Sequence, residues 1–471
     1  MPATLDTPPE TDSALRPRQG WALGAALLGM FVITFDAVVV NVALPSISDD
    51  FGGGISGLQW VVDGYTLMFA GLLLTSGALS DRVGARRAFR WGMALFVVAS
   101  VGCGLAPSMN VLIGARFLQG SAAAVIMPAS MALIGHAYPD PNRRAWAIGM
   151  WALGGGIASS SAPVLGGLLS LASWRLIFFI NVPVGAVALV LLRRVAVSPR
   201  RWRPFDWIGQ VTAVLAMGGI TFGAIEAGAH GITAPEVLGA FTIGLLSLVA
   251  FLVAEARVRY PMMPLSMFRS RNVDVAMAVG FAFVVGYYGL PFVMSLYLQQ
   301  LRGLSSFAAG LVFVPMMVVG AALTPFVASI AARFGTRTLI VTGLGLMTVG
   351  LVVLAAVPDT TTPVALALLM LPVGIAGPLI IPPTMALLLN SVAHDQVGTT
   401  SGVFNTSRQV GGALSVAVFG ALLAGDDFMT GLRVSLLLAA GAALLAAGAA
   451  LTLRRTGHAR LGETVEMEGV A

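Results

Sequence analysis

Asp36 stands inside an apolar stretch, VITFDAVVVNVALP at positions 32–45, where a charged side chain is costly. The apolar segment around it runs from Trp21 to about Ile47, and a helix needs about 20 mostly apolar residues to cross a bilayer. Ionisable residues inside spanning segments are rare and often mark proton or ion pathways. The sequence therefore predicts a functional carboxyl group at Asp36. The alternative is a structural hydrogen bond to Asn41 or to a helix end.

Asp63 and Arg116 are two further ionisable residues expected inside spans, both near a span edge. Burial raises the pKa of a carboxyl group in general, and a nearby cation lowers it. If a conformational change alters hydration and partner distance, each carboxyl group could take up a proton on one side of the membrane and release it on the other. A cationic compound could compete with that proton. Two plainer interpretations stay open: Asp63 could face water, and Arg116 could extend to the lipid headgroups.

The composition places the chain in a membrane. Of its 471 residues, 57% are hydrophobic and 10% are charged, whereas globular domains carry roughly 25% charged residues. The chain has no lysine, which excludes a P-loop ATP site and a lysine Schiff base. Cys103 is the only cysteine and the four histidines are scattered, so neither an intrachain disulfide nor a metal site is predicted. We therefore expect no cofactor, and energy from the proton gradient.

The elements that must position these residues are fourteen predicted spanning helices. They lie near 21–47, 58–79, 88–106, 111–134, 146–170, 176–195, 207–226, 235–256, 273–299, 308–331, 338–357, 363–389, 400–424 and 430–453. With the N-terminus inside, most of the 27 arginines fall in loops and tails on one side, which by the positive-inside rule is the cytoplasm. Both termini are then cytoplasmic. The net charge of +6 reflects membrane orientation, and no nucleic-acid partner is expected.

An internal repeat divides the chain. The pattern R-x-G-x-R occurs at 82–86 and again at 333–337, each time in a predicted cytoplasmic turn. Internal duplication is common in transporters, whose substrate site lies between the repeats. The predicted units are a disordered cytoplasmic tail (1–20), an N-terminal six-helix bundle (21–195), a linker with two extra transmembrane helices (196–271), a C-terminal six-helix bundle (272–453) and a cytoplasmic tail (454–471).

GALSDRVGARR, at 77–87, combines glycines, an acid and arginines in the first of these turns. Gly77 would allow a close helix approach and Gly84 a tight turn, while the arginines would meet carboxylates and helix C-termini. The alternative is an ordinary basic turn. The residues expected to act here are Gly77, Asp81, Arg82, Gly84, Arg86 and Arg87.

GMWALGGGIASSSAPVLGGLL, at 149–169, is rich in small residues, which let membrane helices approach closely. Pro163 removes a backbone hydrogen bond and permits a bend. The alternative is an ordinary small-residue helix interface. The residues of interest are Gly149, Gly154, Pro163, Gly166 and Gly167.

These stretches resemble signatures of the major facilitator superfamily. The segment 77–87 resembles its cytoplasmic gate motif, RFLQG at 116–120 its second motif, and 149–169 the fifth-helix antiporter motif that marks exporters. FDAVVVNVALPSI, LQWVVDGYTL and WRLIFFINVPVG resemble the fourteen-spanning drug:proton antiporters of that superfamily, and the likeness covers essentially the whole chain. Two positions depart from the pattern: Ala162 replaces a glycine before the proline, and Val38 stands where a threonine is frequent.

The resemblance implies an all-α membrane protein with two six-helix bundles and two linking transmembrane helices, which binds substrate near the midplane between the bundles. Soft and aromatic side chains suit a pocket that accepts several hydrophobic molecules, although packing against lipid or a neighbouring helix is their ordinary role. The candidate pocket residues are Asn41, Gln119, Met127, Trp151, Tyr288 and Arg408. The acids near the outer side are expected to be solvated loop charges: Asp49, Asp50, Glu226, Asp426 and Asp427.

The predicted function is proton-coupled efflux of hydrophobic or cationic compounds by alternating access. The protein would act as a monomer in a bacterial cytoplasmic membrane. One alternative is a dedicated exporter of a single endogenous metabolite or antibiotic. Another is a passive channel-like or sensory membrane protein. An enzyme is not expected, because no cluster of nucleophile, base and oxyanion donors stands out in the sequence.

Overall fold

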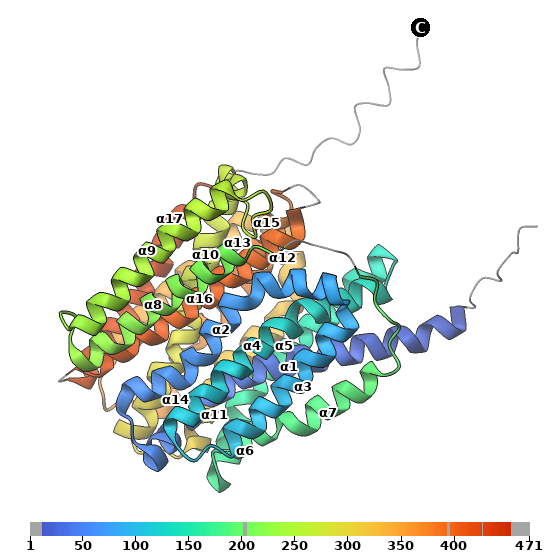
Figure 1. Cartoon of the computed structure of the whole chain (residues 1–471). Helices are drawn as coiled ribbons and strands as arrows, with labels where there is room; N and C mark the ends of the chain where they lie inside the picture. Colours follow the sequence, from blue (N-terminus) through green and yellow to red (C-terminus); the bar gives the residue numbers. More distant parts are fainter. Residues whose placement is uncertain (1–11, 201–204, 393–395, 426, 454–471) are drawn as a thin grey trace, which may run out of the picture.

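Hydrocarbon offers no hydrogen-bond partner to a peptide group, so a chain this apolar satisfies its backbone only as helices or as a closed barrel. The computed structural model describes residues 12–200, 205–392, 396–425 and 427–453, with the backbone alone for 12–18, and this part of the chain consists of helices joined by turns (Figure 1). The helical prediction is confirmed.

The first bundle contains seven helices. They are α1 (Asp12–Phe51), α2 (Gly54–Val83), α3 (Ala85–Gly104), α4 (Met109–Ala137), α5 (Pro141–Ala172), α6 (Leu176–Phe179) and α7 (Asn181–Leu192). Two helices follow, α8 (Trp207–His230) and α9 (Pro235–Arg257), and then the short η1 (Leu265–Arg269). The second bundle contains α10 (Arg271–Leu296), η2 (Tyr297–Leu301), α11 (Ser306–Leu323), η3 (Thr324–Phe326), α12 (Val327–Phe334), α13 (Thr336–Ala356), α14 (Pro363–Leu369), α15 (Leu371–Leu389), α16 (Val397–Leu423) and α17 (Phe428–Ala450).

Each predicted span coincides with a helix or with a run of consecutive helices. Eleven helical stretches of the described chain are long and apolar enough to cross a membrane, and Leu176–Leu192 is a shorter apolar one. The remaining two predicted spans correspond to α3 and α16. The number of crossings therefore stays a prediction, whereas the helical segmentation agrees with the sequence.

Three predicted spans are interrupted close to a proline, and a fourth, 273–299, changes from α10 to η2 at Tyr297. The predicted 176–195 helix breaks between α6 and α7, close to Pro183. The 308–331 helix breaks at η3, which contains Pro325, and the 363–389 helix breaks at Met370, shortly before Pro372. Proline lacks an N–H group and its ring collides with the preceding turn, so the helix ends or shifts at these points.

The predicted disordered tail at 1–20 is wrong for its second part, because α1 already begins at Asp12. Helix nucleation is costly while elongation adds one hydrogen bond per ordered residue, so the long span can extend its helix into polar sequence. Residues 1–11 and the predicted tail from 454 to 471 lie outside the described residues.

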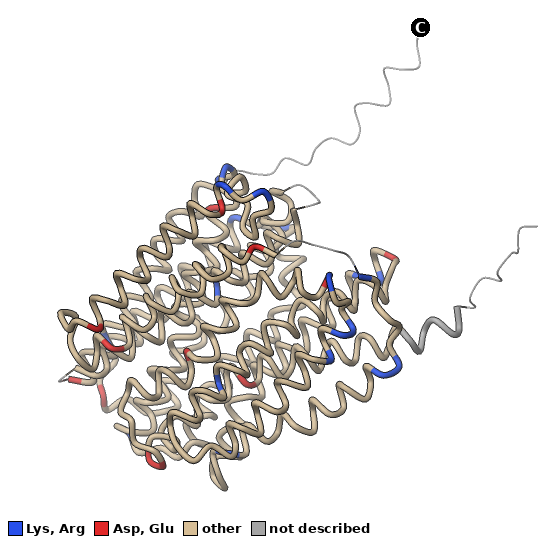
Figure 2. The backbone as a smooth tube through the Cα atoms, in the orientation of Figure 1, with Lys and Arg blue, Asp and Glu red and all other residues tan. Residues whose placement is uncertain are grey.

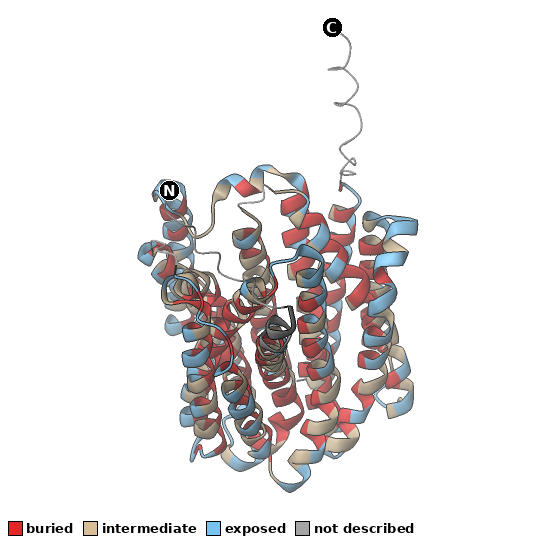
Figure 3. Cartoon of the chain, turned by 90° about the vertical axis from the view of Figure 1, so that its right-hand side faces the viewer, coloured by how far each residue is buried: buried red, intermediate tan, exposed pale blue. Residues whose placement is uncertain are grey.

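The two bundles lie side by side, with α8 packed along the seam against α2 and α16, and α9 packed against α8 (Figure 1). Across the interface, α5 packs against α11 and α2 packs against α16. Buried residues occupy the inward faces of the helices and exposed residues the periphery (Figure 3). We call the end with the turns at Gly84 and residues 193–200 the arginine-rich end (Figure 2), and the opposite end, with the turns at Gly52 and Gly231, the far end.

Hydrogen bonds join the bundles at the far end. The Gln59 amide of α2 donates to the backbone carbonyls of Val416, at 3.0 Å, and Ala417, at 2.6 Å, in α16. On the other side of the interface, two side chains donate to the backbone of α1. Ser295 bonds the carbonyl of Asn41 at 2.6 Å, and Gln299 bonds that of Val42 at 3.0 Å. The structure is thus closed between the bundles at this end.

Glycines of α5 permit close approaches to two neighbouring helices, α1 and α11. A Cβ atom at Gly167 would come within 2.7 Å of the Phe307 Cα atom in α11, and one at Gly154 within 2.9 Å of the Leu27 side chain. Gly166 similarly faces Val39, and the backbone of Pro163 contacts Gly310. The segment at 149–169 therefore packs tightly between α1 and α11, as its small residues predict.

Two glycines behave differently from the prediction. A Cβ atom at Gly77 or at Gly149 would meet no atom within 4 Å. Both lie toward the arginine-rich end, and Gly149 is exposed. The close approach predicted at Gly77 is therefore wrong for this conformation.

Candidate functional site

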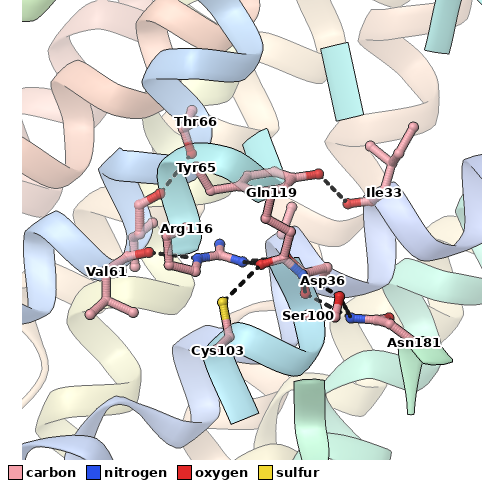
Figure 4. A network of polar contacts seen from close by, with 12 residues as sticks. Ile33, Asp36, Val61, Tyr65, Thr66, Ser100, Cys103, Arg116, Gln119 and Asn181 are labelled. Carbon is pink, nitrogen blue, oxygen red and sulfur yellow. Dashed lines mark hydrogen bonds and ion pairs between the residues drawn. The ribbon is translucent and has the colours of Figure 1, made fainter. Parts of the chain in front are cut away.

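Asp36 lies at the centre of a buried polar network in the first bundle (Figure 4). Its Oδ1 atom accepts hydrogen bonds from the amides of Gln119, at 2.7 Å, and Asn181, at 2.9 Å. Its Oδ2 atom forms an ion pair with Nη1 of Arg116, and neither side chain has any exposed surface. The three partners come from α4 and from the first residue of α7. Both oxygens of the Asp36 carboxyl group therefore have partners.

Arg116 is held by several contacts within the same bundle, while its Nη2 atom is buried without a hydrogen-bond partner. Its Nε atom donates to the carbonyl of Val61 at 2.8 Å, and Nη1 donates to Oε1 of Gln119 at 2.8 Å. The ring of Tyr65 lies 4.5 Å from the guanidinium carbon, and that of Phe178 lies 5.8 Å away. Cation–π contacts strengthen when the groups are removed from water. The alternative that Arg116 extends to lipid headgroups is wrong.

An outer layer fixes the orientation of the network. Ser100 accepts from Gln119 at 2.8 Å and from Asn181 at 3.4 Å, and Cys103 lies 3.5 Å from the oxygen of Gln119. The Tyr65 hydroxyl donates to the carbonyl of Ile33 at 3.0 Å, one turn before Asp36. Moving any one of these side chains would leave further polar groups of the network unpaired, which makes the network stiff. The sequence did not point to Asn181 or Ser100 as members.

Asn41 is not a partner of Asp36, contrary to the structural alternative considered for that residue. The Asn41 amide donates to the carbonyl of Val38 at 3.2 Å within its own helix, and its side-chain oxygen is buried without a hydrogen-bond partner. This residue lies at the bundle interface, because Ser295 of α10 bonds its carbonyl.

Asp63 has the opposite environment to Asp36. It has no exposed surface, and neither carboxyl oxygen has a hydrogen-bond partner. An ionised carboxylate without a counterion or hydrogen bond is very costly in a low-dielectric interior. The form that fits this position is the neutral, protonated acid. The alternative that Asp63 faces water is wrong.

Helical spacing places Asp63 on the face of α2 that meets the second bundle. Gln59, one turn earlier, bonds α16, and Leu67, one turn later, lines an apolar cavity. That cavity has a volume of about 430 Å³ and lies among α2, α8, α9, α10 and α16. Its lining includes Leu67, Ala70, Met217, Phe251, Met262, Met263, Met277, Phe281, Val403 and Leu414. Pockets of this size and apolar character hold drug-sized molecules.

None of the six predicted pocket residues lines this cavity. Gln119 belongs to the Asp36 network. Trp151 donates to Ser130 at 3.0 Å inside the first bundle, where Met127 packs against it. Tyr288 lies against Gly412 of α16. These residues pack between helices, which was the ordinary alternative.

Arg408 is the remaining candidate of that set. Its Nη1 atom lies 3.3 Å from the side-chain oxygen of Asn405, and its guanidinium carbon lies 5.9 Å from the centre of the Phe404 ring. Its Nε atom is buried without a hydrogen-bond partner. The partner expected for it was a backbone carbonyl or the substrate. The observed contacts are with its own helix, α16.

The predicted gate residues form the turn between α2 and α3. Gly84 has φ +90, a backbone conformation that side chains disfavour, and a Cβ atom there would lie 3.0 Å from the carbonyl oxygen of Ser198. Arg86 donates its backbone N–H to the Ser198 hydroxyl at 3.2 Å and Nη2 to the carbonyl of Arg193 at 2.9 Å. Arg82 lies over the ring of Phe205. The turn is therefore braced by the segment that follows α7.

Two acids near the far end have structural partners; Asp50 is 45% exposed, as expected of a solvated charge, whereas Glu226 is 15% exposed. Asp50 accepts from Trp174 Nε1 at 2.8 Å and from Arg175 at 2.7 Å. Glu226 accepts from Trp60 Nε1 at 3.2 Å and from Ser56 at 3.3 Å, which ties α8 to α2. Asp427 caps the N-terminus of α17, and Asp426 lies outside the described residues.

Comparison with known proteins gives consistent results. Residues 26–416 match the Major Facilitator Superfamily. The chain is 32% identical to the methylenomycin A resistance protein of Streptomyces coelicolor, over 91% of each chain. It is 34% identical to the multidrug resistance protein Stp of Mycobacterium tuberculosis, over 84% of this chain and 74% of that protein. A crystal structure of a POT family transporter in complex with 5-aminolevulinic acid superposes with a TM-score of 0.69, at 14% identity, over 91% of this chain and 95% of that one.

Proposed function

The chain belongs to the Major Facilitator Superfamily and is therefore a membrane transporter, not an enzyme, and from this premise we propose that it exports drugs in exchange for protons. The names of its relatives support the efflux direction, since one confers methylenomycin A resistance and another multidrug resistance. The working location is a bacterial cytoplasmic membrane, with the arginine-rich end in the cytoplasm. The protein acts as a monomer of the fourteen-spanning subfamily.

The observation that carries the proton coupling is the buried, unpartnered carboxyl group of Asp63. In the conformation closed at the far end, this group holds a proton that entered from outside. Hydration of the interface from the arginine-rich end gives the carboxylate solvent and lets the proton leave. Because the energetic difference between a dry and a hydrated carboxylate is large, conformation and protonation are linked.

The ion pair of Asp36 and Arg116 has a different role in this proposal. Its network joins α1, α2, α3, α4 and α7 into one rigid unit, so the first bundle moves as a body. Arg116 also bonds the carbonyl of Val61, two residues before Asp63. In this proposal Asp63 carries the transported proton, whereas Asp36 and Arg116 hold α2 in position within the first bundle.

The apolar cavity supplies the substrate site. Its wall of methionine, phenylalanine and leucine side chains adapts to different shapes, because methionine is unbranched and polarisable. Asp63 lies one helical turn beyond Leu67 at the edge of the cavity, so a bound compound can direct one positive charge toward it. The substrates are therefore lipophilic compounds that are neutral or carry a single positive charge.

The test is substrate-driven proton movement in liposomes that contain the purified protein and an internal pH dye. Lipophilic cations are added to the native chain, to Asp63→Asn and to Asp36→Asn, each checked for folding by thermal unfolding. We expect proton movement to disappear in Asp63→Asn while the protein stays folded. Coupled movement that persists in Asp63→Asn and disappears in a folded Asp36→Asn would assign the proton to Asp36 instead.

The narrow alternative is export of one antibiotic, which the name of the Streptomyces coelicolor relative favours. The two specificities are distinguished by competition between structurally unrelated lipophilic compounds for the same flux. Mutual inhibition across the panel supports a broad site, whereas inhibition by one compound class alone supports a dedicated exporter.

A further inference from the structure

A second cavity lies at the arginine-rich end, outside the site described above. It has a volume of about 510 Å³ and is lined by the α2–α3 turn, by α3, by α7 and by residues 193–200. We call it the arginine cavity. Its lining is Val83, Gly84, Arg86, Arg87, Arg90, Ala94, Leu189, Leu192, Arg193, Val197, Ser198 and Arg200.

The charged side chains that line the arginine cavity are all positive. Five of its lining residues are arginines, and the described lining contains no acidic side chain. The amino end of α3 lies in the same wall and adds the positive end of a helix dipole. Five guanidinium groups around one space create a positive field that attracts an anion. Guanidinium forks match the oxygens of a phosphate group in particular.

Hydrogen bonds between the α2–α3 turn and the segment after α7 fix the shape of the arginine cavity. Arg86 bonds the carbonyl of Arg193 and the hydroxyl of Ser198, so the segment after α7 is fixed across the turn. Gly84 adopts positive φ where Ser198 passes closest. These contacts hold Arg193 and Arg200 opposite the arginines of α3.

The surface that leads away from the arginines is apolar. Ala94 and Leu189 form the cavity wall on that side. Further along the same two helices, Leu95 and Val98 of α3 and Val187 and Val190 of α7 are exposed. Trp91 of α3 is 66% exposed beside Arg90, whose guanidinium carbon lies 5.3 Å from the ring centre. Tryptophan is enriched where membrane meets water.

From this combination we propose that the arginine cavity binds the phosphate headgroup of an anionic phospholipid, whose acyl chains lie along the exposed faces of α3 and α7. A basic pocket between transmembrane helices on the cytoplasmic side is the arrangement that recognises such headgroups. The bound lipid bridges α3, α7 and residues 193–200. The proposal is independent of the substrate and of the proton site.

The experiment measures retention of 1-palmitoyl-2-oleoyl phosphatidylglycerol by the purified full-length protein, using native mass spectrometry during a lipid titration. The test variant is Arg90→Gln with Arg200→Gln. The repeat in the second half provides a matched control, Arg333→Gln with Arg337→Gln, which removes the same charge from the equivalent turn. Phosphatidylcholine and inorganic phosphate are the comparison ligands, and thermal unfolding confirms that each variant is folded.

We expect the native protein and the control to retain phosphatidylglycerol equally and the test variant to bind it roughly tenfold to thirtyfold more weakly, since each arginine near an anionic lipid contributes about 1 kcal/mol. Equal weakening in the control would overturn the proposal, because general charge attraction would then explain binding. Equal retention of phosphatidylcholine would also overturn it. Competition by inorganic phosphate as effective as that by the lipid would show a free-phosphate site and reject the lipid.

Discussion

Arg116 and Asp36 are 80 residues apart in the sequence and form an ion pair in which neither side chain reaches the protein surface. The pair is completed by two amides, so each oxygen of the carboxylate has a partner. Asp63, the other buried acid of the first bundle discussed above, has no hydrogen-bond partner at either oxygen. Two carboxyl groups in one bundle are thus held in opposite electrostatic environments.

Removing the charge of Asp36 leaves the guanidinium of Arg116 buried without a counterion. We expect Asp36→Asn to lower the free energy of unfolding by about 3–5 kcal/mol, since breaking one side of a buried ion pair costs this much. Adding Arg116→Gln to Asp36→Asn is expected to recover part of the loss. The measurement is a double-mutant cycle on purified protein unfolded in mixed micelles. Strictly additive effects would contradict the coupling.

Gly167 lets α5 contact α11 at the far end, where a methyl group would lie 2.7 Å from the backbone of Phe307. We expect Gly167→Ala to destabilise this closed arrangement by about 1–3 kcal/mol through overpacking. Gly149→Ala is the matched control, because it adds the same methyl group to the same helix at a position with open space. Thermal unfolding compares the two. Equal effects would show that helix propensity, and not the interface, decides the result.

The apolar cavity can be filled from α8. Ala213 is one of its lining residues, whereas Ala250 is exposed on α9. We expect Ala213→Phe to reduce efflux of bulky compounds more strongly than efflux of small ones, and Ala250→Phe to leave both near the native rate. The measurement is initial efflux rate across a size series. A uniform loss in Ala213→Phe would indicate damage to folding or to the transport cycle.

Glu226 anchors α8 to α2 through the indole of Trp60 and the hydroxyl of Ser56. Hydrogen bonds to a charged group contribute about 1.5–3 kcal/mol, so Glu226→Ala should loosen α8. We expect faster amide hydrogen exchange in α8 and little change in α3. Glu236→Ala removes an exposed acid from the first turn of α9 and serves as the control. Unchanged exchange in Glu226→Ala would mean that apolar packing alone holds α8.

The sequence identified the charged residues of the site but not their pairing. Hydropathy gives the depth of a residue along its helix and not the direction in which its side chain points. Asp63 and Arg116 were therefore placed near a membrane edge, where water or lipid headgroups were credible partners. In the structure both are at zero exposure, because their helix faces turn into the protein. Asn181 was inside a quoted motif, yet nothing in the sequence indicates that its amide bonds Asp36, which lies 145 residues earlier in the chain.

The apolar cavity illustrates a second limit of prediction from the sequence. Its lining comes from α2, from the two helices between the bundles, from η1 and from the second bundle, so it depends on how α8 and α9 pack. Residue type alone selected Trp151 and Met127, which fill the interior of the first bundle. The small residues at 149–169 were easier to interpret, because close packing of helices requires them directly.

The hydrogen bonds that close the far end constrain few of the side chains at the interface. Gln59, Ser295 and Gln299 each donate to a backbone carbonyl of the opposite bundle, so the acceptor does not depend on which side chain stands there. Val416, Ala417 and Val42 can be exchanged for other apolar residues without removing the acceptor. The backbone hydrogen bonds between the bundles at this end therefore depend on three donor side chains, and the side chains beside their acceptors are freer to change.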